Sequence, residues 1–108
     1  MRRFKRRFKS CFFRNISNSL KELLQHIKIK DFTTEAGASF SELNLSYQVF
    51  GKELGTAPVV LINHALTGHS NVAGDQGWWK EIVGHQKAIN TDVYTVLSFN
   101  IPGNGFDG

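Results

Sequence analysis

The chain has 108 residues, of which 41% are hydrophobic and 20% charged, so it is long enough for one small folded domain and too apolar for wholesale disorder. Its single cysteine, Cys11, excludes a disulfide framework and zinc sites built on cysteine pairs, and no apolar run approaches the roughly 18 residues of a membrane span. The net charge of +4 is uneven, because seven of the 13 Lys and Arg residues lie in residues 1–14. Residues 15–108 are mildly acidic, which argues against a nucleic-acid-binding domain.

Residues 1–16 form a basic head, and residues 17–108 are expected to belong to a folded domain. Phe4, Phe8 and Phe12 would share one face of a helix, a pattern typical of binding to an anionic membrane surface or another anionic partner. The alternatives are a solvated tail, or translated sequence that precedes the true start of the protein. We expect the head to take no part in catalysis and Cys11 to be an incidental thiol.

The next elements predicted along the chain are a helix over residues 17–29 and two antiparallel strands. Ser19 and Glu22 form a capping-box pattern ahead of leucines at helical spacing. Residues 29–33 then alternate as a first strand, residues 35–39 make a turn, and residues 43–49 alternate as a second strand. The apolar side chains of the second strand should face the core, with Ser46 and Gln48 on a solvated face.

Two continuous apolar runs, residues 58–63 and 93–99, are typical of strands buried on both faces. About 29 residues separate them, enough for a parallel crossover, and residues 77–83 are predicted to be its helix. The predicted fold class is therefore α/β, with an antiparallel hairpin followed by a parallel βαβ unit. The last strand is expected to leave an apolar sheet edge open, which predicts poor solubility.

Polar and glycine-rich loops follow both apolar runs, at residues 64–70 and 100–108. The carboxyl ends of parallel strands meet at one edge of a sheet, where ligands bind in open α/β folds. These loops are expected to form one side of a site.

Four runs of residues resemble the homoserine O-acetyltransferase family of the α/β-hydrolase superfamily. They are the hairpin from Phe32 to Gly51, Asn63-His64-Ala65-Leu66-Thr67-Gly68, Gly77-Trp78-Trp79, and Lys87-Ala88-Ile89-Asn90-Thr91-Asp92 before Tyr94. Together they cover about residues 30–101, the amino-terminal portion of an α/β-hydrolase fold. The family usually continues with a glycine-rich loop ending in GSTGP, whereas this chain has Ile101-Pro102-Gly103-Asn104-Gly105-Phe106-Asp107-Gly108. That departure bears on acyl and amino-acid specificity.

The resemblance implies acetyl transfer from acetyl-CoA to L-homoserine through a serine acyl-enzyme, a step of methionine biosynthesis, by a cytoplasmic enzyme that is a homodimer when complete. The chain has no G-x-S-x-G elbow, so the catalytic triad is expected to lie outside it and the chain alone to be inactive. By resemblance the backbone N–H of Leu66 is an oxyanion-hole donor, and the substrate loop comprises His64, Ala65, Thr67 and Gly68. Acetyl-CoA is expected as a substrate, with no bound cofactor, no metal and no nucleic acid.

Two alternatives for function remain open. The same scaffold serves esterases and other hydrolases, and a small non-catalytic protein could bind an anionic membrane or nucleic acid through its basic head. For single residues we expect structural roles. His64 should pack or hydrogen-bond within the loop and His69 should be a polar lining residue, rather than the two forming a metal site or a catalytic base. Trp78 and Trp79 should pack in the core and at its boundary. Gly103, Gly105 and Gly108 are expected to form a tight turn beneath the site rather than a phosphate cradle.

Overall fold

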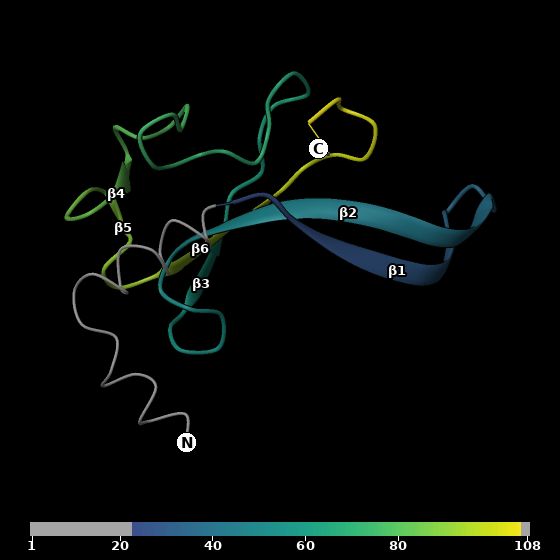
Figure 1. Ribbon diagram of the computed structural model, residues 1–108, viewed down its shortest axis with the longest axis horizontal. Coiled ribbons are helices and arrows are strands. Elements are labelled where there is room, and N and C mark those ends of the chain that lie inside the picture. The colour runs from purple at the N-terminus through teal and green to yellow at the C-terminus, as the bar shows by residue number, and fades with distance from the viewer. Residues whose placement is uncertain (1–22, 107–108) are drawn as a thin grey trace.

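The computed structural model describes residues 23–106, which form a four-stranded sheet and a small two-stranded sheet (Figure 1). The basic head, the capping-box pattern at Ser19 and Glu22, and Gly108 lie outside the described residues. The strands are β1 (Gln25–Thr33), β2 (Ser39–Gly51), β3 (Val59–Leu61), β4 (Val83–Gly84), β5 (Ile89–Asn90) and β6 (Thr95–Phe99). The described part of the chain contains no helical segment with the length and apolar character needed to span a bilayer.

Strands β1 and β2 form the predicted antiparallel hairpin, which projects from the rest of the molecule (Figure 1). The helix predicted over residues 17–29 is wrong for its second half, because residues 25–29 belong to β1 and pair with residues 43–47 of β2. Pairing with the next strand of the hairpin outweighs the local helical spacing of the leucines. The predicted turn is correct: the N–H of Gly37 donates to the carbonyl of Thr34 at 2.9 Å.

The strand order in the larger sheet is β1-β2-β6-β3. Strand β6 is antiparallel to β2 and parallel to β3, so the parallel link predicted between residues 58–63 and 93–99 is confirmed. The expectation that the last strand leaves the open edge is wrong, because β6 lies inside the sheet and β3 lies at its edge.

The crossover between β3 and β6 contains turns and the β4–β5 pair instead of the helix predicted over residues 77–83. The backbone N–H groups of Trp78 and Trp79 donate to the carbonyls of Asn71 and Val72, at 3.2 and 3.0 Å. Those donors are therefore unavailable to a regular helix. A Cβ at Gly77 would lie 2.3 Å from the carbonyl oxygen of Ala73, so this close approach requires glycine.

The core lies between β2, β3, β6 and the crossover. Its members share nearly complete burial: Phe50, Ile62, Val72, Ala73, Val83 and Val96, with Val60 and Ile89 packed against them. Strand β3 is not buried on both faces as predicted, because Val59 is 50% and Leu61 54% exposed. Alternate side chains of a strand point to opposite faces, and within residues 23–106 no helix covers the outer face of β3.

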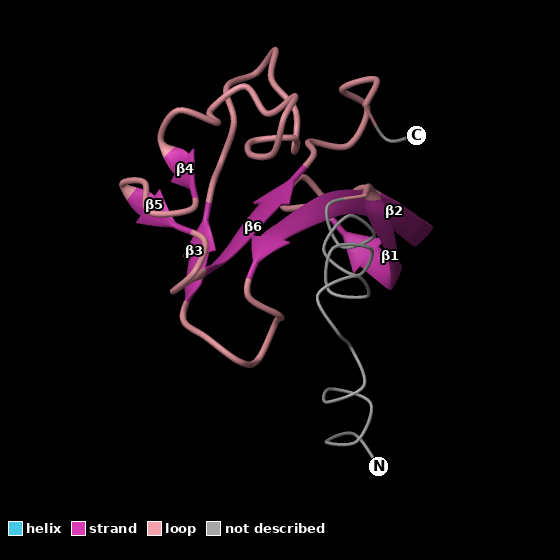
Figure 2. Cartoon of the chain, turned by 60° about the vertical axis from the view of Figure 1, so that its left-hand side comes forward, coloured by secondary structure: helices cyan, strands magenta, loops and turns pink. Residues whose placement is uncertain are grey.

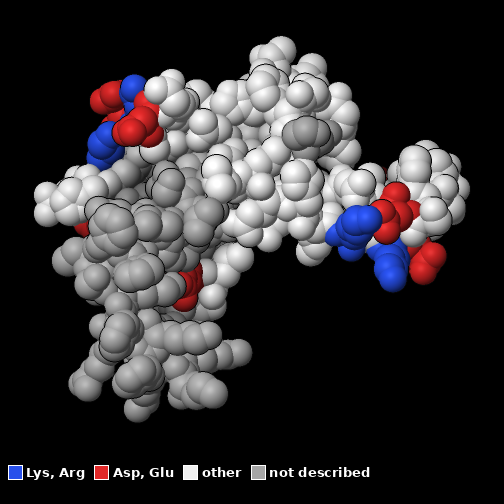
Figure 3. Space-filling view, in the orientation of Figure 1, with Lys and Arg blue, Asp and Glu red and all other residues white. Residues whose placement is uncertain are grey.

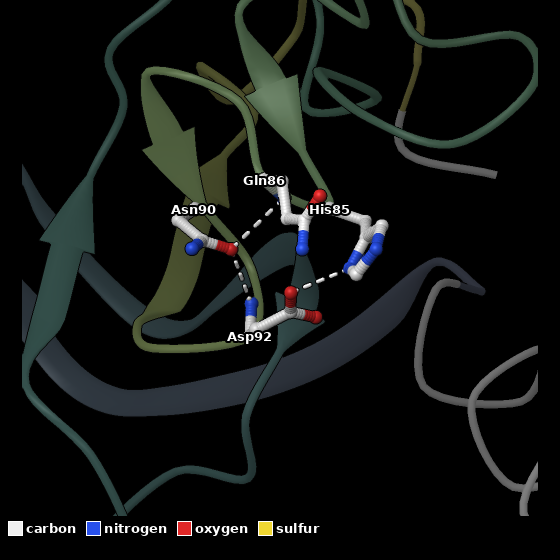
Figure 4. Close-up of polar contacts among 4 residues, drawn as sticks. All are labelled: His85, Gln86, Asn90 and Asp92. Carbon is white, nitrogen blue, oxygen red and sulfur yellow. Dashed lines mark hydrogen bonds and ion pairs between the residues drawn. The ribbon is translucent and has the colours of Figure 1, made fainter.

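The loop from His85 to Asp92 is held by the side chain of Asn90, whose Oδ1 accepts the N–H groups of Gln86 and Asp92 at 3.2 and 3.0 Å (Figure 4). Gln86 has a left-handed backbone, with φ of 53°, so this loop needs such support. His85 Nδ1 lies 2.5 Å from Asp92 Oδ2, but both side chains are exposed.

Replacing Asn90 with alanine is therefore expected to lower the free energy of unfolding by about 1–2 kcal/mol, since two hydrogen bonds are lost. The control, His85→Ala, should change it by less than about 0.5 kcal/mol, because exposed ion pairs contribute little. Urea denaturation measures both. Equal losses in the two variants would contradict this assignment.

Candidate functional site

The loops that follow β3 and β6 meet where these two parallel strands end, at one edge of the larger sheet, as predicted. Both lie on the same side of the sheet in two views of the chain (Figures 1 and 2). The backbone N–H of Ser70 donates to Asn100 Oδ1 at 2.7 Å, and Asn104 Nδ2 donates to the carbonyl of Gly68 at 3.4 Å. The edge that the sequence predicted for a site is therefore built from these two loops.

The loop after β3 is a tight turn with Leu66 at its tip. The carbonyl of Ala65 accepts the N–H of Gly68 at 2.8 Å and lies 2.6 Å from His64 Nδ1. A Cβ at Gly68 would lie 2.9 Å from the Cβ of His64, so the turn closes tightly only with glycine there. His64 thus bonds within the loop, as expected. Its Nε2 is buried and has no hydrogen-bond partner among the described residues.

The predicted site residues occupy successive positions along this turn. His64 and Gly68 are half-buried, whereas Ala65 and Thr67 are exposed and Leu66 is 83% exposed. No acceptor among residues 23–106 takes the N–H of Leu66. Within the described part of the chain the turn therefore leaves this backbone donor available at the sheet edge, and its use as an oxyanion donor stays a prediction.

Sequence reasoning missed a buried polar network beneath this edge. Asn100 is 2% exposed, and its Nδ2 donates to Ser46 Oγ at 2.9 Å and to Ser70 Oγ at 3.0 Å. Ser70 Oγ in turn donates to Gln48 Oε1 at 2.6 Å. The face of β2 predicted to be solvated is therefore buried at Ser46 and Gln48. The available clue was an asparagine placed directly after an apolar strand.

His69 connects the same edge to the crossover. Its carbonyl accepts the indole N–H of Trp78 at 2.9 Å, and its ring lies 4.6 Å from that of Phe106, centroid to centroid. Trp78 and Trp79 stack on each other but are 43% and 36% exposed. Neither belongs to the core, which corrects part of the packing expected for them, because Trp78 turns outward to reach His69.

The loop after β6 is a glycine-containing turn, as expected for its described part. Gly103 and Gly105 both have φ of 84°, and a Cβ at either would meet nothing within 4 Å. The N–H of Asn104 donates to the carbonyl of Ile101 at 3.0 Å. Gly103 and Gly105 are therefore favoured by their left-handed backbone conformation and not by close packing.

Charged side chains lie mainly away from the middle of the visible surface, toward the far end of the hairpin and around β4–β5 (Figure 3). Within residues 23–106 there is no group of three or more His, Cys, Asp and Glu residues arranged to hold a metal ion. The edge offers backbone donors and neutral polar side chains, a set suited to holding an uncharged carbonyl and the negative charge that develops on it.

The chain, including the segment that forms this sheet edge, is similar in sequence to known proteins. The chain is 44% identical over 80 residues to the homoserine O-acetyltransferase of Corynebacterium diphtheriae, a match covering 74% of this chain and 21% of that enzyme. The chain is homologous to the homoserine O-acetyltransferases. The homoserine O-acetyltransferase of Natronomonas pharaonis is 39% identical over 90 residues. No protein-family model matches the chain.

Solved structures place the fold of the chain in the α/β-hydrolase class. The homoserine O-acetyltransferase of Staphylococcus aureus superposes with a TM-score of 0.64 at 30% identity, over 73% of this chain and 24% of that enzyme. Esterase E22 superposes with a TM-score of 0.66 at 28% identity, over 72% of this chain and 23% of that protein. The homoserine O-acetyltransferase homologue described here thus matches an amino-terminal portion of the fold, about a fifth to a quarter of each relative.

Proposed function

We propose that this chain supplies the oxyanion side of an acyltransferase active site that moves an acetyl group from acetyl-CoA to the hydroxyl of L-homoserine. The observation that carries the proposal is the turn at residues 64–68, where the N–H of Leu66 has no acceptor among residues 23–106. The turn lies within a segment homologous to homoserine O-acetyltransferases. In this proposal acetyl-CoA is a substrate and the reaction needs no bound cofactor.

In the proposed reaction a serine oxygen attacks the thioester carbonyl of acetyl-CoA, a C–O bond forms, and the C–S bond breaks to release CoA as its thiol. The homoserine hydroxyl then attacks the acyl-serine, and O-acetylhomoserine leaves as the serine regains its proton. Both steps pass through a tetrahedral oxyanion, which the Leu66 N–H stabilises together with the N–H after the nucleophile. In this proposal the nucleophilic serine comes from outside residues 1–108, which contain no G-x-S-x-G elbow.

The complete protein is proposed to be a cytoplasmic homodimer that acts in methionine biosynthesis. These features are carried over from the resemblance to the homoserine O-acetyltransferase family.

A hydrolase is the second candidate, supported by the likeness to esterase E22. In that case water replaces homoserine as the attacking group, while the acyl-enzyme and its oxyanion donors are unchanged. The acceptor is selected by groups on the other side of the site, so both candidates assign Leu66 the same task.

The test is a chimera in which residues 30–106 of this chain replace the matching segment of the Corynebacterium diphtheriae enzyme. We expect the folded chimera to form O-acetylhomoserine from acetyl-CoA and homoserine, and the 108-residue chain alone to form none. A chimera that hydrolyses acetyl-CoA without making O-acetylhomoserine would favour the hydrolase. Acetyl transfer by the chain alone, or a folded chimera with neither activity, would contradict the proposal.

A further inference from the structure

Both ends of the segment that carries Leu66 are hydrogen-bonded to β6 or to Asn100, the residue that follows it. At the start of the turn, the N–H of Ile62 donates to the carbonyl of Leu97 at 2.9 Å, and Ser98 Oγ donates to the carbonyl of Ile62 at 3.0 Å. At its end, the N–H of Ser70 donates to Asn100 Oδ1 at 2.7 Å. Ser98 lies in β6, and Asn100 is the first residue after it.

Asn100 is the more heavily bonded of these two attachments. Its Oδ1 also accepts from Asn104 Nδ2 at 3.3 Å, and its Nδ2 contacts the carbonyl of Phe106 at 3.3 Å besides Ser46 and Ser70. One buried amide thus joins β2, the turn after β3 and the loop after β6. A buried amide that uses both its oxygen and its nitrogen in this way holds its neighbours in a single arrangement.

We propose that Asn100 is a positioning residue for the oxyanion loop, acting through Ser70 to hold the turn that presents the N–H of Leu66. The inference rests on the proposed function for its catalytic consequence, but the contact itself is independent of that function. An oxyanion donor stabilises charge only when it is held at the right place before reaction. Without Asn100 the N–H of Ser70 would lose its acceptor in a buried site, and the turn would lose its second anchor.

The first test measures amide hydrogen exchange by NMR in the 108-residue chain. Asn100→Ser, whose side chain is too short to reach Ser70, is expected to speed exchange of the Ser70 amide by about tenfold to hundredfold. Asn100→Asp keeps an oxygen for that N–H and should retain most of the protection. The matched control is Ser46→Ala, which removes the side-chain bond between Asn100 and β2 and leaves the Ser70 contact, so the Ser70 amide should stay slow.

The outcomes separate a positioning role from a merely structural one. Slow exchange of Ser70 in Asn100→Ser would overturn the inference, as would equal acceleration in Ser46→Ala. If Asn100→Ser unfolds the chain, Asn100→Asp and Ser46→Ala decide: the inference needs Ser70 protected in both, and fast exchange of Ser70 in either folded variant overturns it.

The second test uses the chimera with acetyl-CoA and homoserine. Asn100→Ser is expected to lower kcat by about tenfold to hundredfold with a smaller change in KM, since a donor displaced by about 1 Å loses most of its effect. Asn100→Asp should restore most of kcat. A fall in kcat that Asn100→Asp does not restore would contradict the inference. An inactive parent chimera would refute the proposed function, while the exchange measurement would still decide whether Asn100 positions the turn.

Discussion

Replacing Leu66 with proline in the chimera is expected to lower kcat for acetyl transfer by about 10²–10³-fold. Proline has no backbone N–H, so the substitution removes the donor that the turn at residues 64–68 presents. The side chain of Leu66 is 83% exposed, so its loss should matter little by itself. The matched control is Leu66→Ala, which keeps the N–H and should retain kcat within a few-fold.

Three measurements make the Leu66 comparison decisive. Thermal unfolding of both variants shows whether the chimera still folds, and steady-state kinetics separates kcat from KM. Loss of a donor used only in the transition state lowers kcat and kcat/KM together. Similar activities in Leu66→Pro and Leu66→Ala, or a change confined to KM, would mean that this N–H does not stabilise the oxyanion.

Replacing Gly51 with alanine is expected to lower the free energy of unfolding by about 2–5 kcal/mol, combining backbone strain with overpacking. Gly51 ends β2 with φ of 79°, and a Cβ there would lie 2.6 Å from the carbonyl oxygen of Tyr94 and 2.7 Å from that of Thr91. Neither backbone oxygen is the end of a flexible side chain. The turn before β6 would therefore have to move.

Gly55 provides the matched control for Gly51. Its φ is 81°, almost the same, but a Cβ there would meet nothing within 4 Å. Gly55→Ala is therefore expected to cost only the strain, about 1–2 kcal/mol. Urea denaturation of the two variants gives the difference directly. If both variants lost the same stability, the contact with Tyr94 and Thr91 would not be the reason for glycine at this position.

The sequence predicted the strands whose patterns depend on local alternation or on continuous apolar character. Residues 43–49 alternate and lie in β2, and the run at residues 93–99 contains β6, which like β2 has a neighbouring strand on each side. The length of the crossover also predicted the parallel pairing of β3 with β6. These features follow from spacing along the chain, which a sequence displays directly.

The two predicted helices show where spacing fails. Leu20, Leu23, Leu24 and Ile27 follow helical spacing, but the backbone of residues 25–29 pairs with β2. Trp78 and Trp79 donate their N–H groups to Asn71 and Val72, a choice set by packing in the crossover. Backbone donors that pair outside the regular spacing of a helix leave no periodic pattern in the sequence.

Part of the candidate site could be predicted from the sequence and part could not. Its location was predictable, because loops after parallel strands converge at one edge of a sheet. The identity of Leu66 came from resemblance to a family. The network around Asn100 was not predictable from local pattern. Polar residues that alternate along a strand, such as Ser46 and Gln48, are ordinarily expected to face solvent, whereas both are buried here. Ser46 is bonded to Asn100, which lies 54 residues away in the sequence.

The role of the Leu66 N–H as an oxyanion donor can be tested with a crystal structure of the chimera. Its nucleophilic serine would be bonded to a tetrahedral phosphonate that mimics the reaction intermediate. The measured quantity is the distance from the backbone nitrogen of Leu66 to the phosphonate oxygen that occupies the oxyanion position. We expect about 2.7–3.1 Å, with the turn still anchored by Asn100. A distance beyond hydrogen-bond range, with another group donating to that oxygen, would show that Leu66 is not an oxyanion donor.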